Sequence, residues 1–144
     1  MNDLFKSSNW FKSTGTLIYE PHGRSPKTWD RVSKPWWLLL MCDQEIVNYA
    51  DYWLKKQGIY SYRYSLYGSH ISVVKGEKPL YEDLWKKYNG VKVSFKYSNA
   101  INDNGKYWWL FVKCPFFKVI REELGLPKRP PYFRFHLTVG RKNP

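Results

Sequence analysis

Two histidine-centred triplets, His70-Ile71-Ser72 and His136-Leu137-Thr138, carry side chains that suit phosphodiester chemistry. An imidazole titrates near neutrality, so one histidine can accept a proton from a nucleophile while another donates a proton to a leaving oxygen. Hydroxyl groups can donate hydrogen bonds to non-bridging phosphate oxygens as negative charge develops on them. The pair of triplets therefore predicts acid–base catalysis of phosphoryl transfer, which needs no metal ion.

Each triplet is expected on a β-strand, where alternate side chains point to the same face. His70 and Ser72 would then share one face, and so would His136 and Thr138. One such triplet supports catalysis only weakly, because chance matches are common. A lone histidine on a β-strand is more often structural than catalytic. Two matching triplets use two of the three histidines in the chain. The third, His22, lies in a segment with Pro and Gly and no motif, and we expect it at the surface.

The elements that would position the triplets occur twice in the same order, which indicates an internal repeat. Residues 36–42 resemble residues 108–114, and both are apolar, aromatic runs of strand length. Each run leads into a helix, the first capped by Asp43 and stopped by Gly58, the second begun by Pro115 and stopped by Gly125. A histidine strand follows each helix, and a further strand precedes each unit, over residues 15–19 and 91–97.

The chain is thus expected to be one domain in two repeated halves, each with the order strand, strand, helix, strand. The first half covers about residues 14–77 and the second about residues 91–141. Apolar residues at helical spacing predict a linking helix over about residues 79–88, within a linker of about 78–90. If the halves pack about a pseudo-twofold axis, both histidines and both hydroxyls converge on one cleft.

Composition favours a partner that carries phosphate. Lys and Arg number 24 against 12 Asp and Glu, so the formal charge of +12 attracts nucleic acid, nucleotides or anionic membrane surfaces. Cys42 and Cys114 lie outside any C-x-x-C pattern, and no zinc spacing is present, so we expect no metal and no cofactor. The first twelve residues lack the apolar stretch of a signal peptide, and no segment could span a membrane. We expect a cytoplasmic monomer with reduced thiols that binds no membrane.

Several residues near the triplets are candidate substrate contacts. Tyr67 and Tyr132 could stack on a nucleotide, and Lys75 and Arg141 could anchor phosphate, although basic residues at strand ends are usually just solvated. In each Trp-Trp pair, at most one ring would face the cleft, because neighbouring strand residues point to opposite faces. Core packing is the alternative role for the other tryptophans.

The paired triplets in a repeated unit resemble the two-histidine (2H) phosphoesterase superfamily, also called LigT-like, whose mark is a pair of H-x-[S/T] motifs. The resemblance covers about residues 36–141. It implies an α+β, bilobal, duplicated fold in which two antiparallel sheets line a central cleft and the helices pack outside. It also implies that His70 and His136 form the acid–base pair, and that Ser72 and Thr138 hold the phosphate. The first motif has Ser where Thr is common, and the family tolerates both.

Members of this superfamily open 2′,3′-cyclic phosphates, trim RNA ends or cleave 2′-5′ oligoadenylates. A phage branch, the anti-CBASS phosphodiesterases, destroys cyclic di- and trinucleotide immune signals. The chain is similar to phage members in size and compactness, which would place it in the host cytoplasm. We therefore expect a cyclic oligonucleotide or RNA as substrate. A catalytically silent module that binds RNA or nucleotides is the alternative, and a structural protein whose histidines merely pack ranks last.

Overall fold

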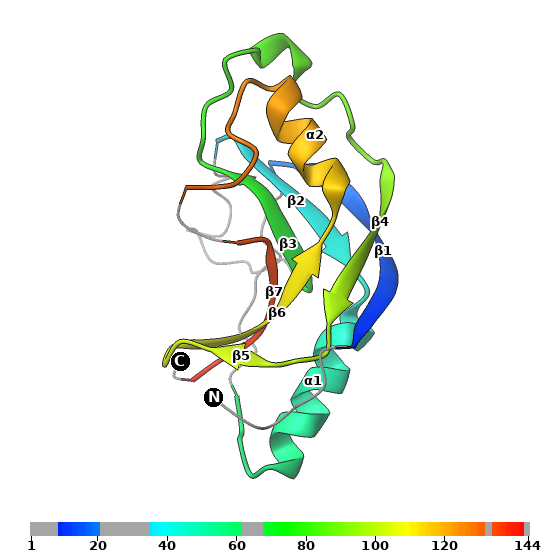
Figure 1. Cartoon of the computed structure of the whole chain (residues 1–144), viewed down its shortest axis with the longest axis vertical. Helices are drawn as coiled ribbons and strands as arrows, with labels where there is room; N and C mark the ends of the chain where they lie inside the picture. Colours follow the sequence, from blue (N-terminus) through cyan, green and yellow to red (C-terminus); the bar gives the residue numbers. More distant parts are fainter. Residues whose placement is uncertain (1–8, 21–34, 62–67, 132–133, 143–144) are drawn as a thin grey trace, which may run out of the picture.

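A single sheet and two α-helices make up the computed structural model, which describes residues 9–20, 35–61, 68–131 and 134–142. Figure 1 shows helices α1 (Gln44–Lys56) and α2 (Pro115–Glu123) at opposite ends of the long axis, with the strands between them. The fold is therefore mixed α+β. Within the described ranges, no helix has the length and apolar character needed to cross a membrane.

The strands are mostly short runs whose buried and exposed residues alternate. Six of them have six residues or more, and β5 is a two-residue strand that pairs with β6. Their bounds are β1 (Trp10–Tyr19), β2 (Trp37–Cys42), β3 (His70–Lys75), β4 (Lys92–Ser98), β5 (Asn102–Asp103), β6 (Tyr107–Lys113) and β7 (His136–Arg141).

The sheet closes into a barrel. Its strand order is β4-β1-β2-β3-β7-β6-β5, and β4 also pairs with β6, so all of these strands except β5 form a closed ring. All of these pairings are antiparallel. Gly15 lies where β1 passes from β4 to β2, and a Cβ there would lie 2.5 Å from the Met41 carbonyl oxygen. A glycine is therefore required for this close approach of β1 and β2.

The two halves repeat the same pairing pattern. In the first half β2 lies between β1 and β3, and in the second half β6 lies between β4 and β7. The halves join through equivalent strands, since β1 pairs with β4 and β3 pairs with β7. The shared pairing pattern gives the arrangement a pseudo-twofold character.

The barrel interior is apolar and forms one continuous core. Residues from both halves fill it, so neither half has a core of its own. Members from the strands include Leu17, Leu38, Leu40, Ile71, Val73, Val93, Phe95, Leu110, Leu137 and Val139. Closing the barrel buries this apolar surface from both halves, and that burial is the main favourable contribution to folding.

Each helix contacts the histidine strand of the other half: α1 contacts β7, and α2 contacts β3. The α2 contact is anchored by Arg121, whose side chain has no exposed surface. Its guanidinium donates hydrogen bonds to both carboxylate oxygens of Glu77, at 2.8 and 2.7 Å, and to the Val73 carbonyl at 3.0 Å. The bidentate geometry compensates the cost of burying this charge.

Two expectations from the sequence differ from the structure. Two separate sheets that line a central cleft are not confirmed, because the edge strands of the two halves pair and make one sheet. The linking helix expected over about 79–88 is a 3₁₀ turn, Glu82–Leu84. Tertiary contacts override the helical pattern there: Trp85 packs edge-on against Tyr19 and Tyr88 against Phe116, and Lys86 takes a positive φ.

Candidate functional site

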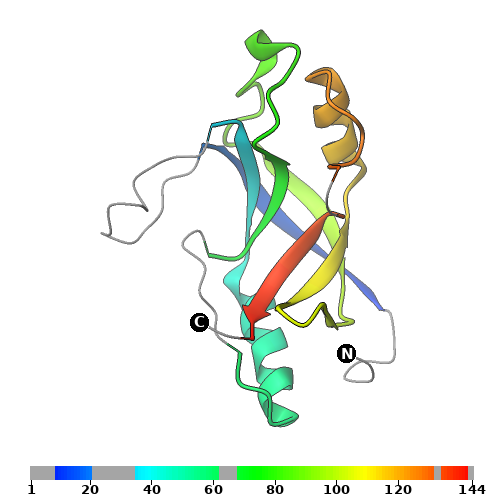
Figure 2. The ribbon, with the colours of Figure 1, turned by 90° about the vertical axis from the view of Figure 1, so that its left-hand side faces the viewer.

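The pairing of β3 with β7 brings the two histidine triplets together. Ile71 lies opposite Leu137, and both side chains point into the core. Continuing this antiparallel register by one residue each way places His70 opposite Thr138 and Ser72 opposite His136. These four side chains alternate with core residues, so they share the outer face of the barrel. Figure 2 shows β3, in green, and β7, in red, side by side on the face turned to the viewer.

Matched bulges bring one basic residue of each half onto the same face. The register between β2 and β3 shifts at Leu38/Leu39, and the register between β6 and β7 shifts at Trp108/Trp109. Each shift adds one residue after the triplet, at Val73 and Val139 in turn, and both are buried. Without the extra residue, a side chain five positions after a histidine would point into the core, because strand residues alternate between faces. With the extra residue, Lys75 and Arg141 lie on the histidine face, opposite Trp37 and Tyr107.

The two imidazoles are held in the same way. His70 Nδ1 lies 2.8 Å from the Gly68 carbonyl oxygen, and His136 Nδ1 lies 2.6 Å from the Arg134 carbonyl oxygen. A carbonyl accepts only, so in each ring Nδ1 carries the proton that it donates. In a neutral ring Nε2 then bears the lone pair. Two histidines with this tautomer can both act through Nε2, one as a base and the other, once protonated, as an acid.

Burial and neighbouring positive charge favour the neutral imidazoles. Burial lowers the pKa of His70; the carbonyl of Gly68 opposes this, and the charges of Lys75 and His136 lower the pKa further. Burial also lowers the pKa of His136, the carbonyl of Arg134 opposes it, and Lys75 adds to the lowering. Lys75 therefore acts on both rings, which is consistent with one shared site.

Trp37 is the side chain that connects the first-half residues. Its Nε1 donates a hydrogen bond to Ser72 Oγ at 3.2 Å, and its ring meets the His70 ring edge-on at 6.1 Å between centroids. Lys75 Nζ lies 5.4 Å from its centroid. In the second half Trp109 makes the edge-on contact with His136, at 6.4 Å. Trp108 instead points into the core, so one ring of that Trp-Trp pair lies on the histidine face and the other does not.

The structure brings together six of the eight site residues expected from the sequence: His70, Ser72, Lys75, His136, Thr138 and Arg141. Tyr67 and Tyr132 lie outside the described residues. The sequence reasoning missed Arg121, although its position was a signal. It follows Phe117 by four residues, so a charged residue lies on the apolar face of α2.

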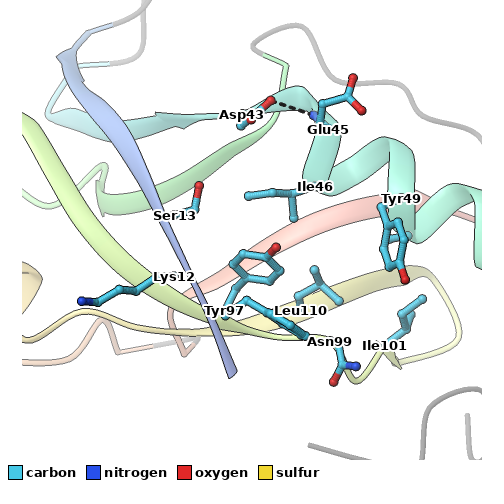
Figure 3. A pocket seen from close by; sticks show the side chains of 12 residues that line it. Lys12, Ser13, Asp43, Glu45, Ile46, Tyr49, Tyr97, Asn99, Ile101 and Leu110 are labelled. Atoms are coloured by element: carbon cyan, nitrogen blue, oxygen red, sulfur yellow. Dashed lines mark hydrogen bonds between the residues drawn. The ribbon is translucent and has the colours of Figure 1, made fainter. Parts of the chain in front are cut away.

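A pocket of about 440 Å³ lies elsewhere, between α1, the start of β1 and the end of β4 (Figure 3). Tyr49 and Tyr97 flank it, and Leu110 and Ile101 lie beneath them. None of the sequence-predicted site residues lines this pocket. It offers no histidine or thiol for acid–base or nucleophilic chemistry, so the histidine face remains the candidate active site.

No group of three His, Cys, Asp or Glu side chains lies close enough to hold a metal ion in the parts of the chain that the structure describes. Both cysteines are free thiols, and burial raises the pKa of Cys42 to about 12. Its charged form is therefore strongly disfavoured, and a nucleophilic role is not supported.

In the comparisons with known proteins, no family model, no curated protein and no solved structure matches the chain.

Proposed function

We propose that this protein is a phosphodiesterase that uses His70 and His136 as a general acid–base pair and requires no metal ion. The observation that carries the proposal is the register of β3 and β7, which sets the two triplets side by side on one face. The matched Nδ1 contacts add to it, because both rings are held ready to act through Nε2. Substrates of this class include RNA-type phosphodiesters, 2′,3′-cyclic phosphates and cyclic oligonucleotides.

In the proposed reaction, a new P–O bond forms as the bond to the leaving oxygen breaks. One neutral histidine takes the proton of the attacking water or ribose hydroxyl through Nε2. The other, protonated on Nε2, gives its proton to the leaving oxygen. After the step the base is protonated and the acid is neutral, so the two histidines have exchanged protonation states. The direction of substrate binding decides which histidine acts as the base.

Four further side chains would hold the non-bridging oxygens. Ser72 lies opposite His136 and Thr138 lies opposite His70 in the continued register, and both can donate their hydroxyl protons. Lys75 and Arg141 add positive charge at the ends of the same two strands. Charge develops on the phosphoryl oxygens during transfer, so these contacts are expected to strengthen in the transition state.

The test is a panel of phosphodiester substrates incubated with the protein in EDTA, with products identified by mass spectrometry. The panel contains RNA ends with 2′,3′-cyclic phosphate, 2′-5′ linkages, single-stranded RNA and cyclic di- and trinucleotides. We expect turnover of at least one class. His70→Ala and His136→Ala should each reduce kcat by about 100-fold or more, as loss of a positioned acid or base does.

His22→Ala is the matched control, since it removes the third histidine, which belongs to neither triplet. It should retain the activity of the unmodified chain. If both triplet variants keep full turnover, the mechanism is wrong. If the unmodified chain binds a substrate tightly and yields no product at long times, the protein is a binding module instead.

A further inference from the structure

A second pocket, of about 510 Å³, lies beside the start of α2 and is strongly basic. Its lining includes four cationic side chains and no carboxylate. They come from three separate stretches: the end of β6, the second turn of α2, and the segment that leads to β7. We call it the α2 pocket, and the cations are Lys113, Lys118, Arg129 and Arg134.

All four cationic side chains are solvent-exposed. Among the described residues, none of the four forms an ion pair with a carboxylate. By contrast, Lys55, Lys86, Lys87 and Lys142 all lie within 4.0 Å of a carboxylate oxygen. The α2 pocket therefore concentrates uncompensated positive charge, which attracts a ligand with several negative charges.

Two of the cations lie over aromatic rings. Lys113 Nζ lies 4.0 Å from the centroid of Trp10, and the Arg134 guanidinium carbon lies 4.0 Å from the centroid of Phe111. Basic side chains interleaved with aromatic rings are typical of surfaces that bind single-stranded nucleic acid. Trp10 and Phe111 are not part of the pocket lining, so these rings border the pocket rather than form it.

Arg134 connects the α2 pocket with His136. Arg134 lines the pocket, and its carbonyl oxygen is the acceptor for His136 Nδ1 at 2.6 Å. Phe111, which lies beneath the Arg134 guanidinium, is paired with His136 across β6 and β7. A chain of phosphates with one member at the histidines can therefore place a neighbouring member in the pocket.

We propose that the α2 pocket binds the backbone phosphates of a linear single-stranded oligonucleotide whose scissile phosphate lies at His70 and His136. The inference rests on the proposed function for the identity of the scissile site. It narrows the substrate to a strand with several phosphates. Each cation that contacts a phosphate releases a counterion, so the affinity falls with salt by a defined slope.

The experiment measures binding of a fluorescein-labelled oligouridylate by anisotropy over a range of NaCl concentrations. The reference is the full chain with His70→Gln and His136→Gln, so that the probe is not cut. Lys118→Gln and Arg129→Gln are added together to this reference. Both side chains are exposed, and within the described part of the chain neither side chain forms a hydrogen bond, since Arg129 contributes only its carbonyl oxygen to Arg121. We expect the slope of log affinity against log salt to shrink by about 1.4, from about 0.7 for each cation.

The matched control adds Lys56→Gln and Lys106→Gln to the same reference. These lysines are also exposed, but Lys56 ends α1, at the opposite end of the molecule from α2 (Figure 1). Lys106 precedes β6, whereas Lys113 ends it. The net charge changes equally in both variants, so the control should keep the slope of the reference.

An unchanged slope in the pocket variant, an equal loss in the control, or no binding of the probe by the reference would each overturn the proposal. If inorganic phosphate displaces the probe at the same concentration as unlabelled oligouridylate, the pocket is a site for a single anion, and the proposal is also overturned. If the double variant fails to fold, Lys118→Gln and Arg129→Gln are measured singly, each with an expected change of about 0.7. Binding is read without turnover, so this result and the test of catalysis can fail separately.

Discussion

The indole Nε1 of Trp37 donates a hydrogen bond to the hydroxyl oxygen of Ser72, at 3.2 Å. The oxygen accepts this bond with a lone pair, so the Ser72 O–H proton must point away from Trp37. A serine hydroxyl otherwise rotates freely between staggered positions. The contact therefore orients the one donor that Ser72 can offer to a phosphate oxygen. In the second half, the branched Cβ of Thr138 restricts its χ1 rotamer but does not fix the direction of its O–H proton.

Trp37→Phe should lower kcat by about three- to tenfold and leave KM nearly unchanged, because a hydrogen bond of about 0.5–1.5 kcal/mol is lost. The phenyl ring still fills the buried space beside His70 and Lys75, so the melting temperature should change little. A kcat equal to that of the unmodified chain would show that the indole does not position Ser72.

The pH profile of kcat/KM should peak below about pH 6.5, the ordinary pKa of histidine, because both histidine pKa values are lowered. Below the optimum the base is protonated, and above it the acid has lost its proton. The two limbs report the pair of histidines rather than either one alone.

Lys75→Gln should move both limbs of this profile to higher pH, because the Lys75 charge lowers the pKa of both histidines. The activity at the optimum should also fall, since Lys75 is a proposed phosphate contact. Steady-state kinetics across the pH range measure both effects. Arg141→Gln serves as a comparison, because Arg141 lies at the equivalent position of the second half. A profile that falls in height without moving would contradict the charge effect.

The free energy of unfolding should rise with pH through the histidine range. Between the lowered folded pKa values and about 6.5, the unfolded chain binds more protons than the folded chain. The stability is therefore fully present above about pH 6.5 and is lost as the pH falls below it. Urea unfolding between about pH 5 and 8 measures this dependence, and His70→Asn with His136→Asn should flatten it. Glu123, whose pKa the hydrogen bond from Tyr88 lowers, titrates below this window.

Arg121→Ala should destabilise the protein by about 3–5 kcal/mol, because it leaves the partly buried Glu77 carboxylate and the Val73 carbonyl without their donor. The change in urea midpoint measures it. Arg121→Met keeps much of the volume and separates lost packing from lost hydrogen bonds. Val73 is the bulge residue of β3, which sets the face on which Lys75 lies. Both variants should therefore also weaken the lowering of the two histidine pKa values by Lys75.

The repeated order of elements was predictable from the sequence because its signals are local. Asp43 caps α1 by accepting a hydrogen bond from the Glu45 N–H at 3.0 Å, and Pro115 begins α2, as expected. Strand alternation predicted which residues of each triplet share a face, and the register of β3 and β7 agrees with it. These features depend only on neighbours along the chain.

The alignment of the two halves was less accurate. Matching the Trp-Trp pairs in the sequence aligns Trp37 with Trp109. The strand pairing of β2 with β3 and of β6 with β7 instead makes Trp37 equivalent to Tyr107, and Leu39 equivalent to Trp109. The sequence match is thus two residues out of register. A shift of two residues preserves the face of every strand residue, so the expectation that at most one ring of each Trp-Trp pair faces the cleft does not depend on this error.

Contacts between distant segments account for what the sequence could not predict. The barrel depends on β1–β4 and β3–β7 pairing, and no local pattern specifies which edges meet. The two bulges add one residue each and leave no mark in composition, although they decide that Lys75 and Arg141 face the histidines. The α2 pocket draws its cations from three stretches that only the fold brings together.

The two halves meet at two seams, where β1 pairs with its counterpart β4 and β3 pairs with its counterpart β7. Each edge of the half-unit is therefore self-complementary. A fragment carrying one strand–strand–helix–strand unit would expose both of its seam strands with unpaired backbone groups. A second copy of the same fragment presents the matching edges, so two copies can close a symmetric barrel as an isologous homodimer. In such a dimer each subunit would contribute one histidine to a site on the twofold axis. The single chain therefore has the form of two fused subunits, and its candidate active site lies where a subunit interface would have been.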